Sequence, residues 1–130
     1  MCSDYTVVNN RIKYFEMSRV YQQNRALGLI SNEVGAALRY IAGRKDHCVS
    51  TCVGKSFQTF SCNHFRLLAV SGLHTEEISC LAADKYLIYS ASGTIIYGWR
   101  RGNEIKHKYI GHAVKVTHLL PFGFHLISVS

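Results

Sequence analysis

The sequence predicts an all-β protein that contains the opening blades of an incomplete β-propeller. Three observations support this fold class: an internal repeat, short strand-like segments between turn residues, and apolar side chains on both faces of those segments. One sequence offset joins Gly54 with Gly93 and also joins Phe60 with Trp99. Because repeats of about 40 residues are typical of stacked structural units, this offset favours a tandem repeat.

The repeat extends toward the end of the chain. The same offset joins Gly72 with Gly111, Leu81 with Leu120, and Leu87 with both Cys48 and Leu126. A third copy therefore begins before the sequence stops.

Within one period, the sequence predicts four short strands over residues 78–81, 86–91, 94–99 and 105–110, and a further strand over 116–120 opens the next unit. Asp84, Gly93 and the pair Gly102-Asn103 separate these segments. They are turn residues, because Gly tolerates positive φ and Asp or Asn bonds its own local backbone. Four strands joined by short turns form one antiparallel meander.

Apolar residues cover both faces of the predicted sheet. Residues 87–89 and 95–97 are consecutive apolar or aromatic positions, whereas a sheet with one wet face alternates apolar and polar residues. Stacked repeats can shield both faces, which is the arrangement of propeller blades. Tyr86, Tyr89 and Tyr97 are accordingly expected to face neighbouring blades.

Two local features resemble the WD-repeat blade, in which Gly-His opens a repeat and Trp-Asp ends its third strand. Gly111-His112 precedes the predicted strand 116–120, and Trp99 closes a third strand. The match is partial: Arg100 stands where the Asp belongs, Phe60 replaces the Trp one repeat earlier, and Leu73 stands where a His belongs. The resemblance implies a hydrogen-bonded brace of Asp, His and Ser or Thr, and His112 lacks the Asp.

The chain from residue 18 onward resembles one nucleolar WD-repeat family, that of UTP-B component twenty-one, also called the WD-repeat protein thirty-six family. Four segments carry the resemblance: 25–32, 53–57, 78–84 and 119–123. Gly35 departs from it by standing where a proline is expected, and residues 1–17 match nothing in the family. The expected organisation is therefore an unmatched N-terminal extension (1–17) followed by opening blades truncated within a blade (18–130).

The resemblance implies a non-catalytic scaffold of the small-subunit processome, a small nucleolar ribonucleoprotein, supporting small-subunit rRNA processing and ribosome biogenesis in the nucleolus of the nucleus. The implied partners are other UTP-B WD-repeat proteins and pre-rRNA or small nucleolar RNA, with no membrane, no small-molecule substrate and no cofactor. The alternative is a truncated WD-repeat interaction module outside the nucleolus, or a fragment without function.

The charge agrees with an acidic partner but does not identify one. Fifteen Lys and Arg against eight Asp and Glu give a net charge of +7. Basic clusters can release counterions from phosphates, although small clusters are more often solvated turns than a nucleic-acid surface. The candidate RNA or protein contacts are Arg44, Lys45, Arg100, Arg101, Lys106 and Lys108.

An incomplete set of blades predicts an open edge. Ser130 is expected to end a second strand of the third unit, and residues 27–31 resemble the segment that closes a propeller ring. Open faces leave apolar groups and unpaired backbone in water, so the isolated chain is expected to aggregate or to need a partner. A fragment, a short isoform and a truncated gene model all fit this expectation.

Catalytic and metal chemistry find no support in the residue pattern. Cys48, Cys52, Cys62 and His64 invite a zinc hypothesis, but residues four apart on a strand lie about 13 Å apart, so buried thiols are favoured. No Ser lies in a GxSxG elbow, and Gly54-Lys55-Ser56 lacks the upstream glycine of a phosphate loop. The odd cysteine count and the absence of a leader-like N-terminus disfavour a disulfide scaffold, and no apolar run reaches membrane length.

Overall fold

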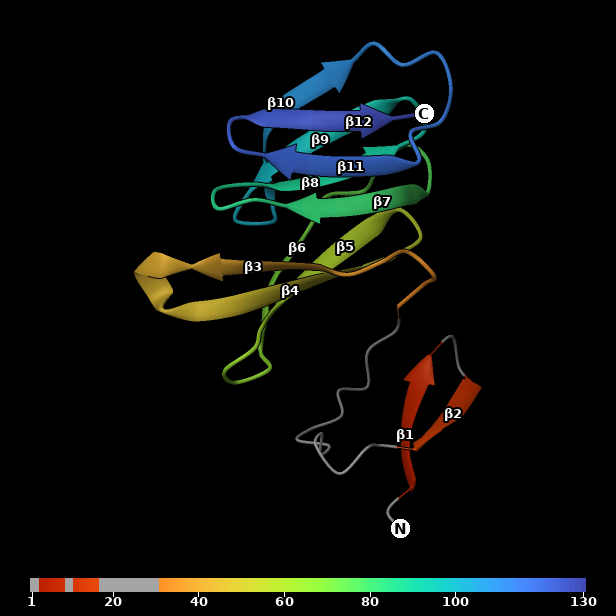
Figure 1. Cartoon of the computed structure of the whole chain (residues 1–130), viewed down its shortest axis with the longest axis vertical. Coiled ribbons are helices and arrows are strands. Elements are labelled where there is room, and N and C mark those ends of the chain that lie inside the picture. Colours follow the sequence, from red (N-terminus) through yellow and green to blue (C-terminus); the bar gives the residue numbers. More distant parts are fainter. Residues whose placement is uncertain (1–2, 9–10, 17–30) are drawn as a thin grey trace.

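The computed structural model describes residues 3–8, 11–16 and 31–130 (Figure 1). Strands β1 (Ser3–Val8) and β2 (Arg11–Glu16) pair as an antiparallel hairpin. The expected domain boundary after residue 17 lies outside the described residues and stays a prediction. The expected ring-closing segment, 27–31, also lies outside them apart from Ser31.

The rest of the described chain forms two four-stranded antiparallel sheets and one hairpin, which confirms the all-β prediction. The first sheet has the order β3-β4-β5-β6 and includes a short 3-10 turn, η1; its elements are β3 (Ala37–Ile41), η1 (Ala42–Arg44), β4 (Asp46–Val53), β5 (Ser56–Ser61) and β6 (Leu67–Val70). The second sheet follows the same order with β7 (Ile78–Ala83), β8 (Ile88–Ser92), β9 (Ile95–Arg100) and β10 (Glu104–Ile110). Strands β11 (His118–Phe122) and β12 (His125–Val129) form the hairpin.

The constant offset between the first two sheets is a true structural equivalence. Gly54 and Gly93 occupy corresponding turns with φ of 58° and 59°, a conformation that glycine adopts without strain. Phe60 pairs with Val49, and Trp99 pairs with Ile88 in the corresponding register. The two sheets are therefore copies of one blade.

The third unit is shifted by one position, which corrects the constant offset expected across it. The backbone N–H of Ile78 donates to the Gly54 carbonyl at 2.9 Å, and the N–H of Val116 makes the same bond to Gly93. The offset from Ile78 to Val116 is one shorter than the offset from Gly54 to Gly93, because a single residue is missing between Gly93 and the third unit. The equivalent of Leu81 is consequently Leu119 instead of Leu120. Separately, the strand begins at His118 and not at the expected residue 116.

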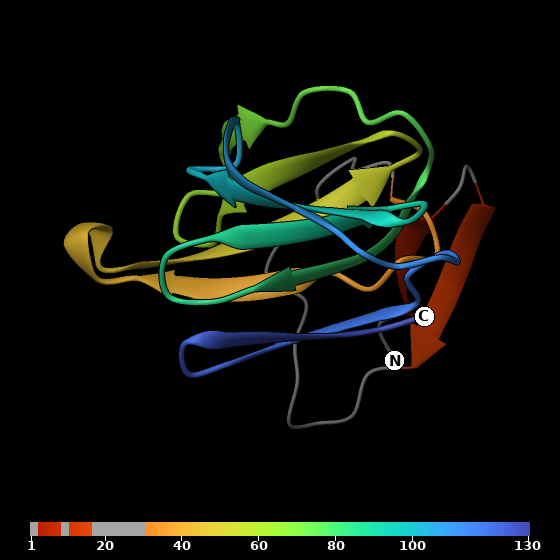
Figure 2. The same cartoon turned by 90° about the horizontal axis from the view of Figure 1, so that it is seen from above.

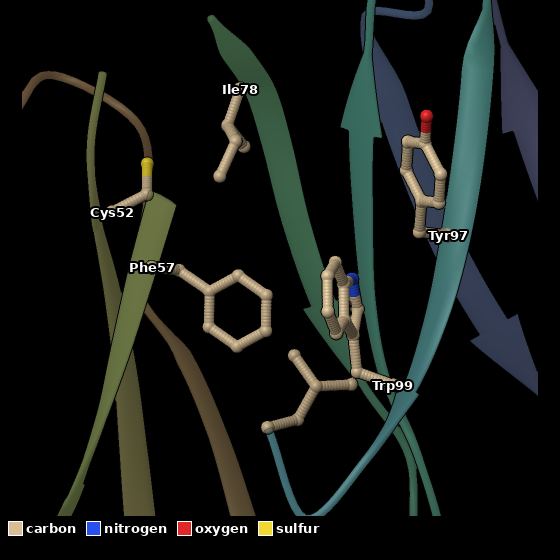
Figure 3. Packing of buried hydrophobic residues seen from close by; sticks show 6 residues of the cluster. Cys52, Phe57, Ile78, Tyr97 and Trp99 are labelled. Carbon is tan, nitrogen blue, oxygen red and sulfur yellow. The ribbon is translucent and has the colours of Figure 1, made fainter. Parts of the chain in front are cut away.

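The second sheet lies between the first sheet and the β11–β12 hairpin (Figures 1 and 2), and apolar side chains fill the space between consecutive units. The larger cluster joins β4 and β5 to the second sheet through Cys52, Phe57, Ile78, Ile88, Tyr97 and Trp99. Figure 3 shows Phe57 directed at Trp99, with ring centroids 5.5 Å apart in an edge-to-face arrangement. A smaller cluster of Ala91, Ile96 and Val116 joins the second sheet to the hairpin, with Leu119 and Leu126 packed against it. This packing confirms stacked blades.

One aromatic expectation is wrong. Tyr89 and Tyr97 are buried, but 68% of Tyr86 is exposed. Tyr86 belongs to a turn, because the Asp84 carboxylate accepts hydrogen bonds from the backbone N–H groups of Tyr86 and Leu87 at 2.6 and 2.7 Å. The strand that was expected from residue 86 therefore starts at Ile88.

The outer face of the β11–β12 hairpin is mostly apolar and is uncovered within the described residues. Its side chains alternate between half-buried and exposed, and the exposed apolar members are Leu120, Phe122, Ile127 and Val129, with fully exposed Phe124 in the turn. Two histidines, His118 and His125, are exposed on the same face. The described sheets form no closed ring, as expected for a partial propeller.

Candidate functional site

A buried histidine fastens the two blades together. The His74 ring Nδ1 lies 2.8 Å from the Lys55 carbonyl oxygen, and Nε2 lies 2.7 Å from Ser90 Oγ. Since a carbonyl oxygen only accepts, Nδ1 carries the proton and Nε2 accepts from the Ser90 hydroxyl. Trp99 Nε1–H in turn donates to Ser90 Oγ at 2.8 Å. The result is a chain of directed hydrogen bonds from β9 through β8 to the β4–β5 turn.

This histidine corrects the alignment that placed Leu73 at the position of the repeat's His. His74 is that residue, and His112 reproduces its contact, with Nε2 at 2.7 Å from Ser128 Oγ. His112 therefore has the serine partner of the expected brace. The sequence contained the evidence, because each histidine precedes its serine by the same separation of 16, a pattern that a search at the repeat offset alone misses.

The His–Ser pair does not have the environment of a nucleophile. Ser90 has no exposed surface, and its oxygen is already engaged by His74 and Trp99. Burial lowers the pKa of His74, so the imidazole is kept neutral in the folded chain. The arrangement braces the blade interface and is inaccessible to a substrate.

The first blade lacks this brace. At the repeat offset, Gly35, Thr51 and Phe60 stand in place of His74, Ser90 and Trp99, respectively. The Thr51 hydroxyl is buried and has no hydrogen-bond partner among the described residues, because the glycine and the phenylalanine offer none. Other contacts hold the blade at neighbouring positions, namely Ser50 with Thr59 at 2.9 Å and Ser61 with Asp46. The hydrogen bond from Ser61 lowers the pKa of Asp46.

A basic pocket of about 550 Å³ lies where the second blade meets the first. Arg39 from β3 and Arg44 from η1 line it together with Lys85 from the β7–β8 turn. Arg100 at the end of β9 and Arg101 in the β9–β10 turn complete the set of cations. No carboxylate is among the described residues that line it. We call this site the interblade basic pocket.

The β9–β10 turn places two of these arginines. Arg101 has φ of 56°, and Gly102 has φ of 81° and is buried. A Cβ at Gly102 would lie 3.0 Å from Thr59 Oγ1 and 3.4 Å from the Ala69 Cβ, so the turn packs tightly on the first blade. A glycine there allows Arg100 and Arg101 to reach the pocket.

Arg39 is the least exposed cation of the pocket. Its Nη1 donates to the Tyr86 carbonyl at 3.0 Å, which links β3 to the β7–β8 turn. Its Nε is buried and has no hydrogen-bond partner within the described part of the chain. Burial lowers the pKa of Arg39, although the nearby carboxylate of Asp84 acts in the opposite direction.

The structure gathers three of the six contact residues that the sequence suggested. Arg44, Arg100 and Arg101 line the pocket, and Arg39 and Lys85, which sequence reasoning missed, complete it. The other three lie elsewhere: Lys45 ends η1 with φ of 49°, Lys106 forms an ion pair with Glu104 at 2.8 Å, and Lys108 Nζ lies 5.8 Å from the centre of the Tyr97 ring.

The cysteines of the described chain are free thiols. Cys48 and Cys52 are buried, and burial raises the pKa of each. Across the described residues, no three His, Cys, Asp or Glu side chains gather as a metal site. The same part of the chain contains no helix with the length and hydropathy of a membrane span.

Comparison with known proteins identifies homologues. The chain is 40% identical over 112 residues to WD repeat-containing protein 36 of Homo sapiens, a match that covers 86% of this chain and 12% of the human protein. It is 35% identical over 122 residues to the U3 small nucleolar RNA-associated protein 21 homolog of Schizosaccharomyces pombe, covering 92% of this chain and 13% of that protein. No protein-family model matches the chain.

Among solved structures, the crystal structure of Saccharomyces cerevisiae Sqt1 shares the fold. The match has a TM-score of 0.51 at 12% identity and covers 67% of this chain and 24% of that chain. The chain spans only 12% and 13% of the length of these two curated relatives. It is thus a homologue of part of WD repeat-containing protein 36 and of U3 small nucleolar RNA-associated protein 21, which confirms the resemblance seen in the sequence, and its fold is a partial WD-repeat propeller.

Proposed function

We propose that this chain is a non-catalytic scaffold of the nucleolar small-subunit processome, where it supports small-subunit rRNA processing and ribosome biogenesis. The observation that carries the proposal is the 40% identity over 112 residues to WD repeat-containing protein 36, joined by a yeast relative whose name records association with U3 small nucleolar RNA. The proposed partners are other UTP-B WD-repeat proteins and pre-rRNA or small nucleolar RNA, in the nucleus and nucleolus.

The geometry supports a scaffold over an enzyme. The buried pair of Ser90 and His74 is closed to solvent, and together with Trp99 it ties β8, β9 and the β4–β5 turn into one rigid interface. The described surface offers partners a basic pocket and an apolar hairpin face. These features suit docking, because a charged recess and an apolar patch are the usual components of interaction surfaces.

The test is recovery of the tagged full chain from cells, followed by measurement of co-purified U3 small nucleolar RNA, pre-rRNA and UTP-B proteins. We expect enrichment of all three over the tag alone. A Phe57→Ala variant is the matched control, because loss of the interblade packing with Trp99 should abolish recovery of the particle. A chain that is excluded from the nucleolus and recovers none of these components favours the alternative, an interaction module acting elsewhere or a fragment without function.

A further inference from the structure

We propose that the interblade basic pocket binds the phosphate backbone of single-stranded RNA and that Tyr86 stacks on one of its bases. The proposal rests on the proposed function in one respect: the chain must work beside RNA. It adds a site, a ligand class and a set of residues that the function itself does not specify.

The charge of the pocket favours an anion. Arg39, Arg44, Lys85, Arg100 and Arg101 line a single recess of about 550 Å³, within the usual range for ligand sites, with no carboxylate among the described lining residues. Like charges that face one space repel each other, and a bound phosphate relieves that repulsion. Arginine is suited to this role, because its planar guanidinium binds two phosphate oxygens at once.

An unused hydrogen-bond donor lies at the same place. Arg39 Nε is buried without a partner in the described chain, although its Nη1 is held by the Tyr86 carbonyl. Buried donors are almost always paired in folded proteins, so an orphaned one suggests an acceptor that arrives with a ligand. Asp84 does not fill the role, since its carboxylate accepts from the Tyr89 hydroxyl and from two backbone N–H groups.

Tyr86 favours RNA over an acidic peptide. It lines the pocket, 68% of it is exposed, and its backbone is fixed by Asp84 and Arg39. The Lys85 ammonium lies 5.5 Å from the centre of its ring. An exposed aromatic ring beside a row of cations is the combination that binds single-stranded nucleic acids, because the ring stacks on a base while the cations follow the backbone.

The test is fluorescence anisotropy of a labelled 12-nucleotide oligouridylate titrated with the full chain at several salt concentrations. Arg100→Gln/Arg101→Gln should weaken binding about tenfold or more, because each arginine gives up charged hydrogen bonds. The slope of log affinity against log salt should fall by about 1.4, since each lost phosphate contact contributes about 0.7 for single strands. Tyr86→Leu should weaken binding about tenfold through lost stacking.

The matched control is Lys106→Gln/Lys108→Gln, which removes the same charge from the neighbouring strand outside the pocket. Circular dichroism verifies that each variant is folded, and Lys85→Gln serves as a single-site replacement if the arginine pair does not fold. Equal losses in the two double variants would show that net charge alone attracts RNA, and the pocket proposal would be rejected. Polyglutamate that binds more tightly than oligouridylate, with the same arginine dependence, would also overturn it in favour of an acidic peptide.

The outcome separates this proposal from the proposed function. If the chain recovers pre-ribosomal particles from cells while the Arg100→Gln/Arg101→Gln variant binds oligouridylate like the wild type, the scaffold role stands and the pocket assignment fails. If pocket-dependent RNA binding is measured but no particle is recovered, the pocket assignment stands and the scaffold role fails.

Discussion

Ser90→Ala should destabilise the folded chain by about 2–4 kcal/mol, because it leaves two buried polar groups without a hydrogen-bond partner. The substitution leaves the Trp99 indole N–H without an acceptor and His74 Nε2 without a donor, and the exposed fractions of these residues are only 2% and 6%. An unsatisfied buried group costs about 1–3 kcal/mol. The void left by one hydroxyl is small, so the polar penalty dominates.

The matched substitution is Thr51→Val, at the equivalent position of the first blade. There the hydroxyl is already buried without a partner among the described residues, so replacing it with a methyl group of similar shape removes a penalty. We expect stability to rise by about 1 kcal/mol. The change in unfolding free energy should therefore have opposite signs at the two equivalent positions. If the loss of any buried hydroxyl had the same effect, the two signs would agree.

The assay is urea unfolding at low micromolar concentration, monitored by far-ultraviolet circular dichroism, with Trp99→Phe as a second background. In that background Ser90→Ala should cost about 1 kcal/mol less, because the indole donor is absent and only His74 loses a partner. Destabilisation of the same size by Ser90→Ala and Thr51→Val would refute the reasoning, as would a Ser90→Ala effect under about 0.5 kcal/mol, the size typical of a neutral surface substitution.

Two further predictions concern pH and the open hairpin. Burial lowers the pKa of His74, so the unfolded chain binds a proton that the folded chain does not, and stability should fall as pH drops through the ordinary histidine range near 6.5, by at most about 1.4 kcal/mol per pH unit. Urea midpoints between pH 7.5 and 5 should show a shallower dependence in His74→Asn; equal slopes would contradict this. Leu120→Glu/Ile127→Lys should reduce self-association in analytical ultracentrifugation, because these exposed residues pair directly across the hairpin. Glu104→Lys/Lys106→Glu, which exchanges the same two charges on β10 away from the hairpin, should leave association unchanged.

The sequence predicted the blades because strand pairing repeats where register is conserved. Phe60 and Trp99 occupy the same register in successive sheets, so one constant offset was enough to find both. The constant offset fails at the third unit, where a missing residue shortens it by one. The residue equivalent to His112 is therefore His74, whereas the constant offset points to Leu73. A comparison at one fixed offset misaligns the repeats after a deletion between them. The His-to-Ser separation lies within each unit, so a deletion between units leaves it unchanged.

Side-chain pattern alone also misjudged Tyr86. The run 86–91 has strand composition, but the Asp84 carboxylate captures the two backbone N–H groups that follow and delays the strand to Ile88. These hydrogen bonds to the Asp84 side chain compete with strand pairing for the backbone N–H groups, and the pattern of apolar residues does not reveal them. The consequence is functional as well as structural, because the turn leaves an aromatic ring exposed beside Lys85.

The interblade basic pocket could not be predicted from spacing, because its cations come from both blades. Arg39 and Arg100 are far apart in the sequence, and they line the same recess only because the β9–β10 turn packs on Thr59 and Ala69 of the first blade. The glycine that allows this approach carries no charge and matches no binding motif. Charge clusters in a repeat protein are therefore best judged after the blades are stacked, since neighbouring cations such as Lys106 and Lys108 can lie outside the recess while distant arginines share it.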